Sequence, residues 1–227
     1  MKTRSKILFC IFLLLGLADV LLLAFGNETA PHYVKPFLMP FLCATALSEL
    51  LPENSGRMPL LLAIGLLFHT AGDIFLLFDS HGFVWFALGL GSFLVGHLFY
   101  LSILIPSLGK LSYKESMTAG LAPLAAIALI VPFFKLEWPL NAAVTVYGFV
   151  LLCVATCGVI GALRKMKYSG WIIAGGIFFI ISDALIAVNS FLGIDFPLRH
   201  AVDMATYLFA ECCLVGAMVS REKSAVE

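Results

Sequence analysis

Eight apolar segments occupy most of the 227 residues, and each is about as long as a bilayer's hydrocarbon core requires of a helix. They cover residues 7–25, 34–50, 58–78, 83–105, 116–134, 140–163, 170–191 and 201–219. Hydrophobic residues make up 61% of the chain and charged residues 12%, against about 25% charged in a soluble domain. Inside lipid, helices satisfy all of their own backbone hydrogen bonds. We therefore predict an all-α, polytopic membrane helix bundle of eight transmembrane helices, forming one domain over residues 1–227.

The distribution of basic residues predicts how this bundle is oriented. Lys2, Arg4 and Lys6 precede the first segment, and most other lysines and arginines fall in the loops that an eight-helix topology places on the same side. We expect both termini to be cytoplasmic, in the inner membrane of a bacterium. The first segment is long for a cleaved signal peptide and contains Asp19, so we expect the chain to retain it. The net charge of zero argues against a nucleic-acid partner.

Two aspartates lie inside apolar segments, where an ionised carboxylate costs roughly 2.5–3.5 kcal/mol. Asp73 belongs to the sequence GDIFL at 72–76, and Asp183 to the similar sequence SDALI at 182–186. The similarity suggests a parallel duplication of four plus four helices. The two acids could be structural, hydrogen-bonded to neighbouring helices. We favour a catalytic pair, because in apolar surroundings one carboxyl can stay protonated while the other is ionised.

Other polar residues fall at similar depths and are candidates for binding a substrate. On the last segment, Asp203, Tyr207 and Glu211 are spaced by four residues and share one helical face. The remaining candidates are His97, Tyr100, Asn189 and Lys35. Each has a plainer interpretation: a packed histidine, a helix-pairing acid, or a lysine whose amine reaches the interface. We expect Lys35 to bind an anionic headgroup, and the role of Glu211 stays open.

The sequence offers little support for metal or serine chemistry. All six cysteines lie in apolar segments, which argues against a disulfide framework. The chain has no Gly-x-Ser-x-Gly elbow, no His-Glu-x-x-His and no P-loop. We expect no metal and no organic cofactor, so hydrolysis would use carboxylates and water.

An ordered set of short motifs resembles a known family of membrane proteins. The motifs are KPFLMP at 35–40, GDIFLL at 72–77, GHLFY at 96–100, SD at 182–183 with Asn189, and YLFAE at 207–211. Their order is similar to that of the YhhN-type proteins, which include the lysoplasmalogenases. The resemblance covers nearly the whole chain. It departs from the family pattern at Glu211, where a glutamine is expected.

The resemblance implies an ether hydrolase that cleaves the vinyl ether bond of lysoplasmalogens, with choline or ethanolamine headgroups, to a fatty aldehyde and a glycerophospho-headgroup. It assigns the catalytic roles to Asp73 and Asp183. The residues suit this chemistry, because an oxocarbenium-like transition state calls for one acidic and one ionised carboxyl. The substrate would be a lysophospholipid taken from the membrane lipid. The alternative is a proton-coupled transporter or a binding protein for a small amphiphile, since parallel repeats with buried carboxylates also suit a carrier.

Overall fold

The computed structural model describes residues 1–27, 29, 31–51 and 56–226. These residues form eight α-helices and two short 3-10 helices. In chain order they are α1 (Thr3–Ala24), α2 (Pro31–Leu50), α3 (Met58–Leu76), η1 (Asp79–His81), α4 (Phe83–Ser107), α5 (Tyr113–Ile130), η2 (Val131–Phe134), α6 (Leu140–Leu163), α7 (Ser169–Leu192) and α8 (Arg199–Val226). The described part of the chain contains no strand, so the predicted all-α bundle is confirmed.

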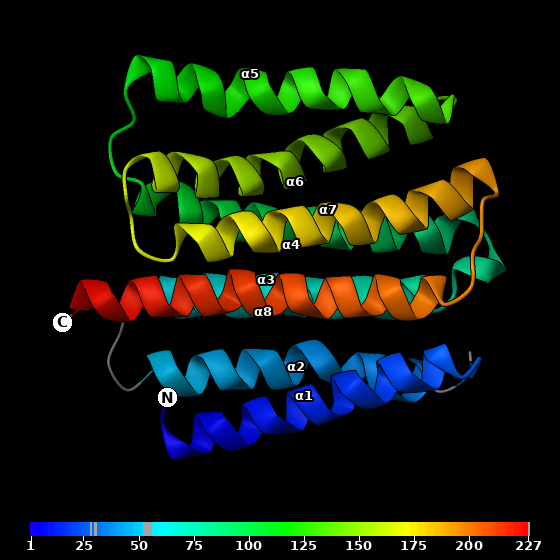
Figure 1. Ribbon diagram of the computed structural model, residues 1–227, viewed down its shortest axis with the longest axis horizontal. Helices are drawn as coiled ribbons and strands as arrows, with labels where there is room; N and C mark the ends of the chain where they lie inside the picture. Colours follow the sequence, from blue (N-terminus) through cyan, green and yellow to red (C-terminus); the bar gives the residue numbers. More distant parts are fainter. Residues whose placement is uncertain (28, 30, 52–55, 227) are drawn as a thin grey trace.

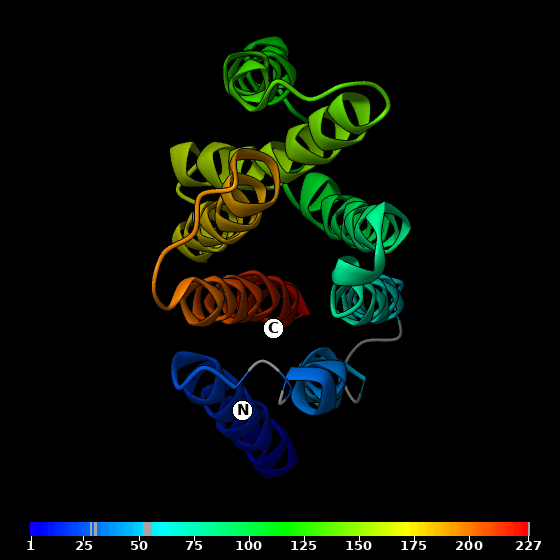
Figure 2. The same cartoon turned by 90° about the vertical axis from the view of Figure 1, so that its right-hand side faces the viewer.

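Seven of the α-helices form a closed ring, and helix α5 lies outside it. Following the packing contacts, the ring runs α1, α2, α3, α4, α6, α7, α8 and back to α1. Helix α5 packs against α6 from outside, at the edge of the bundle opposite α1 and α2 (Figure 2). The two termini lie at the same end of the bundle (Figure 1), which we call the terminal end. The candidate site must therefore lie inside the ring, or between the ring and α5.

The expectation that all eight helices are apolar enough to span a membrane is corrected to seven. Among the described residues, α1, α3, α4, α5 with η2, α6, α7 and α8 have the necessary length and composition. Helix α2 does not, because its 20 residues include Lys35 and Glu49 and the internal prolines Pro36 and Pro40. It nevertheless lies in the ring between α1 and α3. The proposed duplication of four plus four helices is not confirmed.

Capping explains where the fifth helix begins. The Ser112 side chain accepts a hydrogen bond from the Glu115 amide, and the Glu115 side chain accepts from the Ser112 amide. This capping box satisfies two amides that the first turn leaves unpaired. Helix α5 consequently starts at Tyr113, three residues before the apolar segment predicted from residue 116.

Glycines bring α3 and α4 into close contact. A Cβ atom on Gly72 would lie 2.7 Å from the Phe93 ring, so the missing side chain admits the neighbouring helix. A Cβ on Gly96 would lie 2.1 Å from His69 Cδ2 and 3.0 Å from the Gly65 carbonyl oxygen. Only hydrogen fits at these positions unless the helices separate. The α3–α4 contact therefore fixes the depth at which His69 and Phe93 enter the ring.

We predict that Gly96→Val destabilises the protein by about 1–3 kcal/mol, because the added methyl groups collide with His69 and the α3 backbone. The measurement is the thermal unfolding midpoint in detergent. Gly91→Val is the matched control, since a Cβ there meets nothing within 4 Å. Equal midpoints for the two variants would contradict the prediction.

Candidate active site

Two side-chain bridges cross the ring from α3 to α8, which face each other in Figure 2. The Tyr207 hydroxyl donates a 2.9 Å hydrogen bond to Asp73 Oδ2. One turn away, His69 Nδ1 lies 2.6 Å from Glu211 Oε1. The two pairs are spaced by four residues on each helix, so antiparallel helices align them one above the other. Asp73 is 4% exposed, and His69 and Glu211 are fully buried.

The His69–Glu211 bridge also reaches a third helix, α4. The Tyr100 hydroxyl donates a 2.7 Å hydrogen bond to Glu211 Oε2, so both carboxylate oxygens of Glu211 have partners. Tyr100 is also fully buried. Glu211, whose role was open from the sequence, therefore connects α3, α4 and α8 through hydrogen bonds inside the ring.

A group of ionisable side chains lies beside the Asp73–Tyr207 bridge, toward the end of the bundle away from the termini. We call it the Lys35 cluster: Lys35, Asp19, Asp73 and Asp203. The Lys35 amine is within electrostatic range of all three carboxyls. Asp19 is fully buried, and neither of its carboxylate oxygens has a hydrogen-bond partner among the described residues. The cluster thus combines one amine with three acids from α1, α3 and α8.

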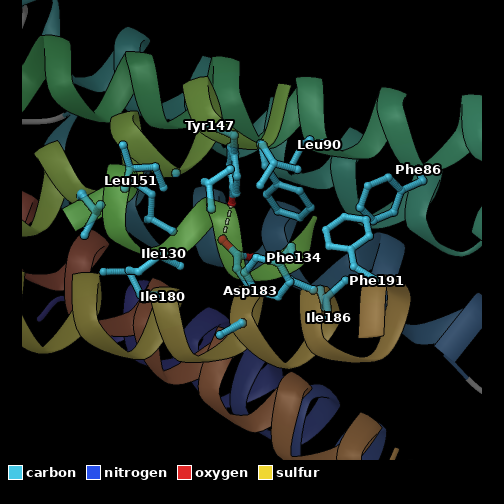
Figure 3. A pocket seen from close by; sticks show the side chains of 18 of the residues that line it. Phe86, Leu90, Ile130, Phe134, Tyr147, Leu151, Ile180, Asp183, Ile186 and Phe191 are labelled. Carbon is cyan, nitrogen blue, oxygen red and sulfur yellow. Dashed lines mark hydrogen bonds between the residues drawn. The ribbon is translucent and has the colours of Figure 1, made fainter. Parts of the chain in front are cut away.

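Asp183 has a different partner and different surroundings. The Tyr147 hydroxyl donates a 2.6 Å hydrogen bond to Asp183 Oδ2, and both residues line a cavity between α4, α6 and α7 (Figure 3). The rest of the lining is apolar, and α5 and η2 contribute to it from outside the ring. Asp183 is half-buried, whereas Asp73 is buried.

Aromatic rings separate the two aspartate–tyrosine pairs. Phe93 lines the cavity on one side and contacts Tyr207, at a centroid distance of 5.9 Å, on the other. Phe179 contacts Tyr207 at 5.5 Å and His97 at 4.4 Å. His97 in turn contacts Tyr147 at 6.0 Å. No hydrogen bond joins Asp73 to Asp183 within the described residues. That the two acids work as a catalytic pair stays a prediction.

The remaining predicted residues are held by local hydrogen bonds. His97 Nδ1 donates to the Phe93 carbonyl oxygen at 2.9 Å. Asp203 Oδ1 accepts from the Ser182 hydroxyl at 2.6 Å. The Asn189 amide is 3.5 Å from the Ile194 carbonyl oxygen, at the far end of α7. Asp203 thus belongs both to the Lys35 cluster and to the α7–α8 contact. His97 lies between Tyr147 and Phe179, while Asn189 lies apart.

Arg199, at the start of α8, is held by residues close to it in the sequence. Its Nε donates a 2.7 Å hydrogen bond to Asp195 Oδ1, and its Nη2 lies 2.9 Å from His200 Nε2. The guanidinium holds the pKa of Asp195, in the loop before α8, below its ordinary value. This leaves Lys35 as the better placed of the two cations to act inside the site.

Tyr147 and His69 have partners that sequence reasoning did not predict. A single tyrosine in an apolar segment gives no signal of its own, and Tyr147 meets Asp183 only because α6 packs against α7. His69 and Glu211 carried a weak signal, because both lie deep in apolar segments where a charge requires a partner. Pairing the two across 142 positions needed the ring.

The residues that the structure describes do not bring three or more histidine, cysteine, aspartate or glutamate side chains together in the way a metal ion needs. The expectation of a reaction without a metal stays a prediction.

Comparison with known proteins points to one family. The YhhN family profile matches residues 31–218. The chain is similar to "Lysoplasmalogenase TMEM86A" of Homo sapiens, with 31% identity over 193 residues, which cover 80% of this chain and 74% of the human protein. No solved structure matches the chain significantly. The matched residues 31–218 include both aspartate–tyrosine pairs and Lys35.

We predict that Glu211→Ala destabilises the protein by about 3–5 kcal/mol, because it leaves His69 and Tyr100 buried without their partner. Glu211→Gln retains a hydrogen-bonding group there and should cost less. Asp195→Asn breaks an ion pair whose acid is 61% exposed and screened by solvent, so it should cost much less. Thermal unfolding in detergent measures all three. A loss for Glu211→Ala no larger than that for Asp195→Asn would refute a structural role for the bridge.

Proposed function

The chain belongs to the YhhN family, and from that membership we propose that it is a lysoplasmalogenase. The proposed reaction is hydrolysis of the vinyl ether bond of a 1-alkenyl lysophospholipid, giving a fatty aldehyde and a glycerophospho-headgroup. The observation that carries this proposal is the pair of tyrosine-bound aspartates, Asp73 and Asp183, inside an apolar helix ring. The relative of this chain named a lysoplasmalogenase supports the reaction class.

The chemistry requires a proton donor and a site for water. In the proposed first step, a protonated carboxyl transfers its proton to the alkene carbon that is not bonded to oxygen, which leaves an oxocarbenium ion. An ionised carboxylate stabilises this cation and takes a proton from the attacking water, giving a hemiacetal. The bond between the hemiacetal carbon and the glycerol oxygen then breaks, and that oxygen acquires a proton. One water molecule is consumed.

The two aspartates supply these roles in our proposal, with the substrate lying between them. The ring of Phe93 now occupies the intervening space, because it contacts Tyr207 and also lines the cavity beside Asp183. We propose that Phe93 moves aside when substrate binds. Each tyrosine leaves one oxygen of its aspartate available, since each donates to a single oxygen, Oδ2.

The headgroup is proposed to lie in the Lys35 cluster. A lysine amine binds a phosphate as a point charge. Lys35 is half-buried in the second turn of α2, a helix that begins at the end of the bundle away from the termini. The acids of the cluster, Asp19 and Asp203, would suit the positive nitrogen of an ethanolamine or choline group. His97, Tyr100, Asn189 and Tyr207 complete the proposed binding residues. The proposal also takes both termini to be cytoplasmic.

We predict that the purified protein releases fatty aldehyde from a 1-alkenyl lysophospholipid. Asp73→Asn and Asp183→Asn should each lower kcat by about 10²–10⁴, the usual contribution of a general acid or base. Asp79→Asn is the control, because Asp79 is exposed on η1. Aldehyde assays on folded protein, checked by gel filtration, give the measurement. Full activity in either site variant would eliminate the two-aspartate mechanism.

We predict that Lys35→Gln raises KM by about 10- to 100-fold with a smaller change in kcat, because a charged hydrogen bond to phosphate is worth about 1.5–3 kcal/mol. Lys114→Gln, at an exposed position near the terminal end, is the matched control. The readout is initial rate against lysolipid concentration below its critical micelle concentration. An unchanged KM for Lys35→Gln would mean that the phosphate binds elsewhere.

A further inference from the structure

The cavity beside Asp183 has an almost entirely apolar lining. Its volume is about 150 Å³, and all of its lining residues are apolar except Tyr147 and Asp183. Figure 3 shows the Asp183 carboxyl pointing from α7 toward the Tyr147 hydroxyl, among aliphatic and aromatic side chains. A chamber of this composition suits a hydrocarbon that carries one polar group at a fixed place.

The polar group of the chamber has one oxygen to offer. Asp183 Oδ2 accepts the Tyr147 hydrogen bond, and Oδ1 has no hydrogen-bond partner among the described residues. Unlike both carboxylate oxygens of Asp19, Oδ1 of Asp183 is not fully buried. The free oxygen is therefore reachable from the cavity. Tyr147 fixes the carboxyl so that this oxygen keeps its orientation.

Aromatic rings close the chamber at the end away from the termini. Phe191 of α7 contacts Phe86 of α4 at a centroid distance of 5.7 Å and Phe134 of η2 at 5.9 Å. These rings belong to α4, α7 and η2, so three separate elements close this end of the chamber.

Helix α5 forms the outer wall of the chamber and has fewer buried residues than any other described α-helix of the bundle. Its only buried residues are Pro123 and Ile127. Ile127 packs into the space left by Gly148 of α6, where a Cβ would lie 2.4 Å from Ile127 Cδ1. At its other end α5 is held by Arg164, which donates two hydrogen bonds to Glu115. A lipid chain can therefore enter from the bilayer beneath the Ile127 end while the Arg164 end stays fixed.

We infer that this chamber binds the hydrocarbon chain of a single-chain ether lipid, with the ether end of the chain against Asp183 Oδ1. The inference rests on the proposed function and deepens it, since it assigns the chain to the α5–α7 side of the bundle and makes Asp183 the acid nearest the reacting bond. With a proton on Oδ1, Asp183 can donate a hydrogen bond to an ether oxygen, whereas a plain bilayer chain offers no acceptor. A two-chain lipid would need a second chamber. Hydrogen bonding and shape thus both favour the single-chain ether lipid.

The test uses a saturated 1-alkyl lysophosphocholine that carries a diazirine in its chain. Without a vinyl ether it cannot be hydrolysed, so binding is measured apart from activity. After ultraviolet irradiation of the detergent-solubilised protein, mass spectrometry locates the label. We expect it on the cavity-facing segments that contain Ile127 to Phe134 and Ile180 to Phe191. Excess unlabelled lysolipid should compete, and diacyl phosphatidylcholine should not.

Ala187→Trp is the test variant, because Ala187 lines the chamber and an indole ring would fill it. Labelling of the two segments should fall by about tenfold, given that a filled chamber has no space for the chain. Ala205→Trp, on an exposed face of α8, is the matched control and should label normally. Where gel filtration shows that Ala187→Trp does not fold, Ala184→Phe replaces it, since Ala184 also lines the chamber.

Two results would overturn the inference. Labelling concentrated on α1, α2 or the first turns of α8 would place the chain beside the Lys35 cluster instead. Uniform labelling of lipid-facing residues that neither Ala187→Trp nor competitor changes would indicate a bilayer chain only. Labelling as expected, without aldehyde release from the vinyl ether substrate, would support the binding site and refute the hydrolase.

Discussion

The bridge between α3 and α8 is the contact on which the interior of this protein depends. These helices face each other across the ring and are joined by the long polar side chains of Asp73–Tyr207 and His69–Glu211. In lipid, an unpaired acid at either position would be costly, so each pair holds the two walls at one separation. Tyr100 connects a third helix, α4, to the His69–Glu211 bridge. The space around Asp73 keeps its shape because both carboxylate oxygens of Glu211 are paired in the neighbouring bridge.

The arrangement divides the ring between polar and apolar functions. On the α1–α2 side, Lys35 and three carboxyls form a charged region that would suit a zwitterionic headgroup. On the α6–α7 side, the chamber beside Asp183 is almost entirely apolar. Phe93 and Phe179 lie between the two regions. An amphiphile has the same division, with a charged head and a hydrocarbon tail joined at the reacting bond. This correspondence is the reason that the ether-lipid hydrolase is a better proposal than a carrier, whose substrate would lie at the centre of the bundle.

The buried acids have different surroundings, and this bears on their roles. Asp73 is enclosed and lies within electrostatic range of the Lys35 amine, whereas Asp183 opens on a chamber whose lining contains no lysine, arginine or histidine. A carboxyl without nearby cations suits proton donation, and one near an amine suits the ionised role. The two similar motifs at 72–76 and 182–186 therefore lead to two distinct sites. In each site the aspartate accepts a hydrogen bond from a tyrosine on another helix, so its immediate partner is that tyrosine and not a second acid.

The sequence by itself determined the class of fold, the approximate helices and the family. Segment length and composition are local properties, and the ordered motifs are read directly along the chain. It also identified Asp73, Asp183, Lys35 and Tyr207 as residues of interest, because a polar group within an apolar segment is visible without a structure. It overestimated α2, whose lysine and prolines interrupt an otherwise apolar run. Only the tertiary structure decided which residues meet: Tyr147 with Asp183, and His69 with Glu211. It alone revealed the aromatic layer between the acids and the position of α5 outside the ring. Both follow from how helices pack, and contacts between separate helices leave no periodic signal along the chain.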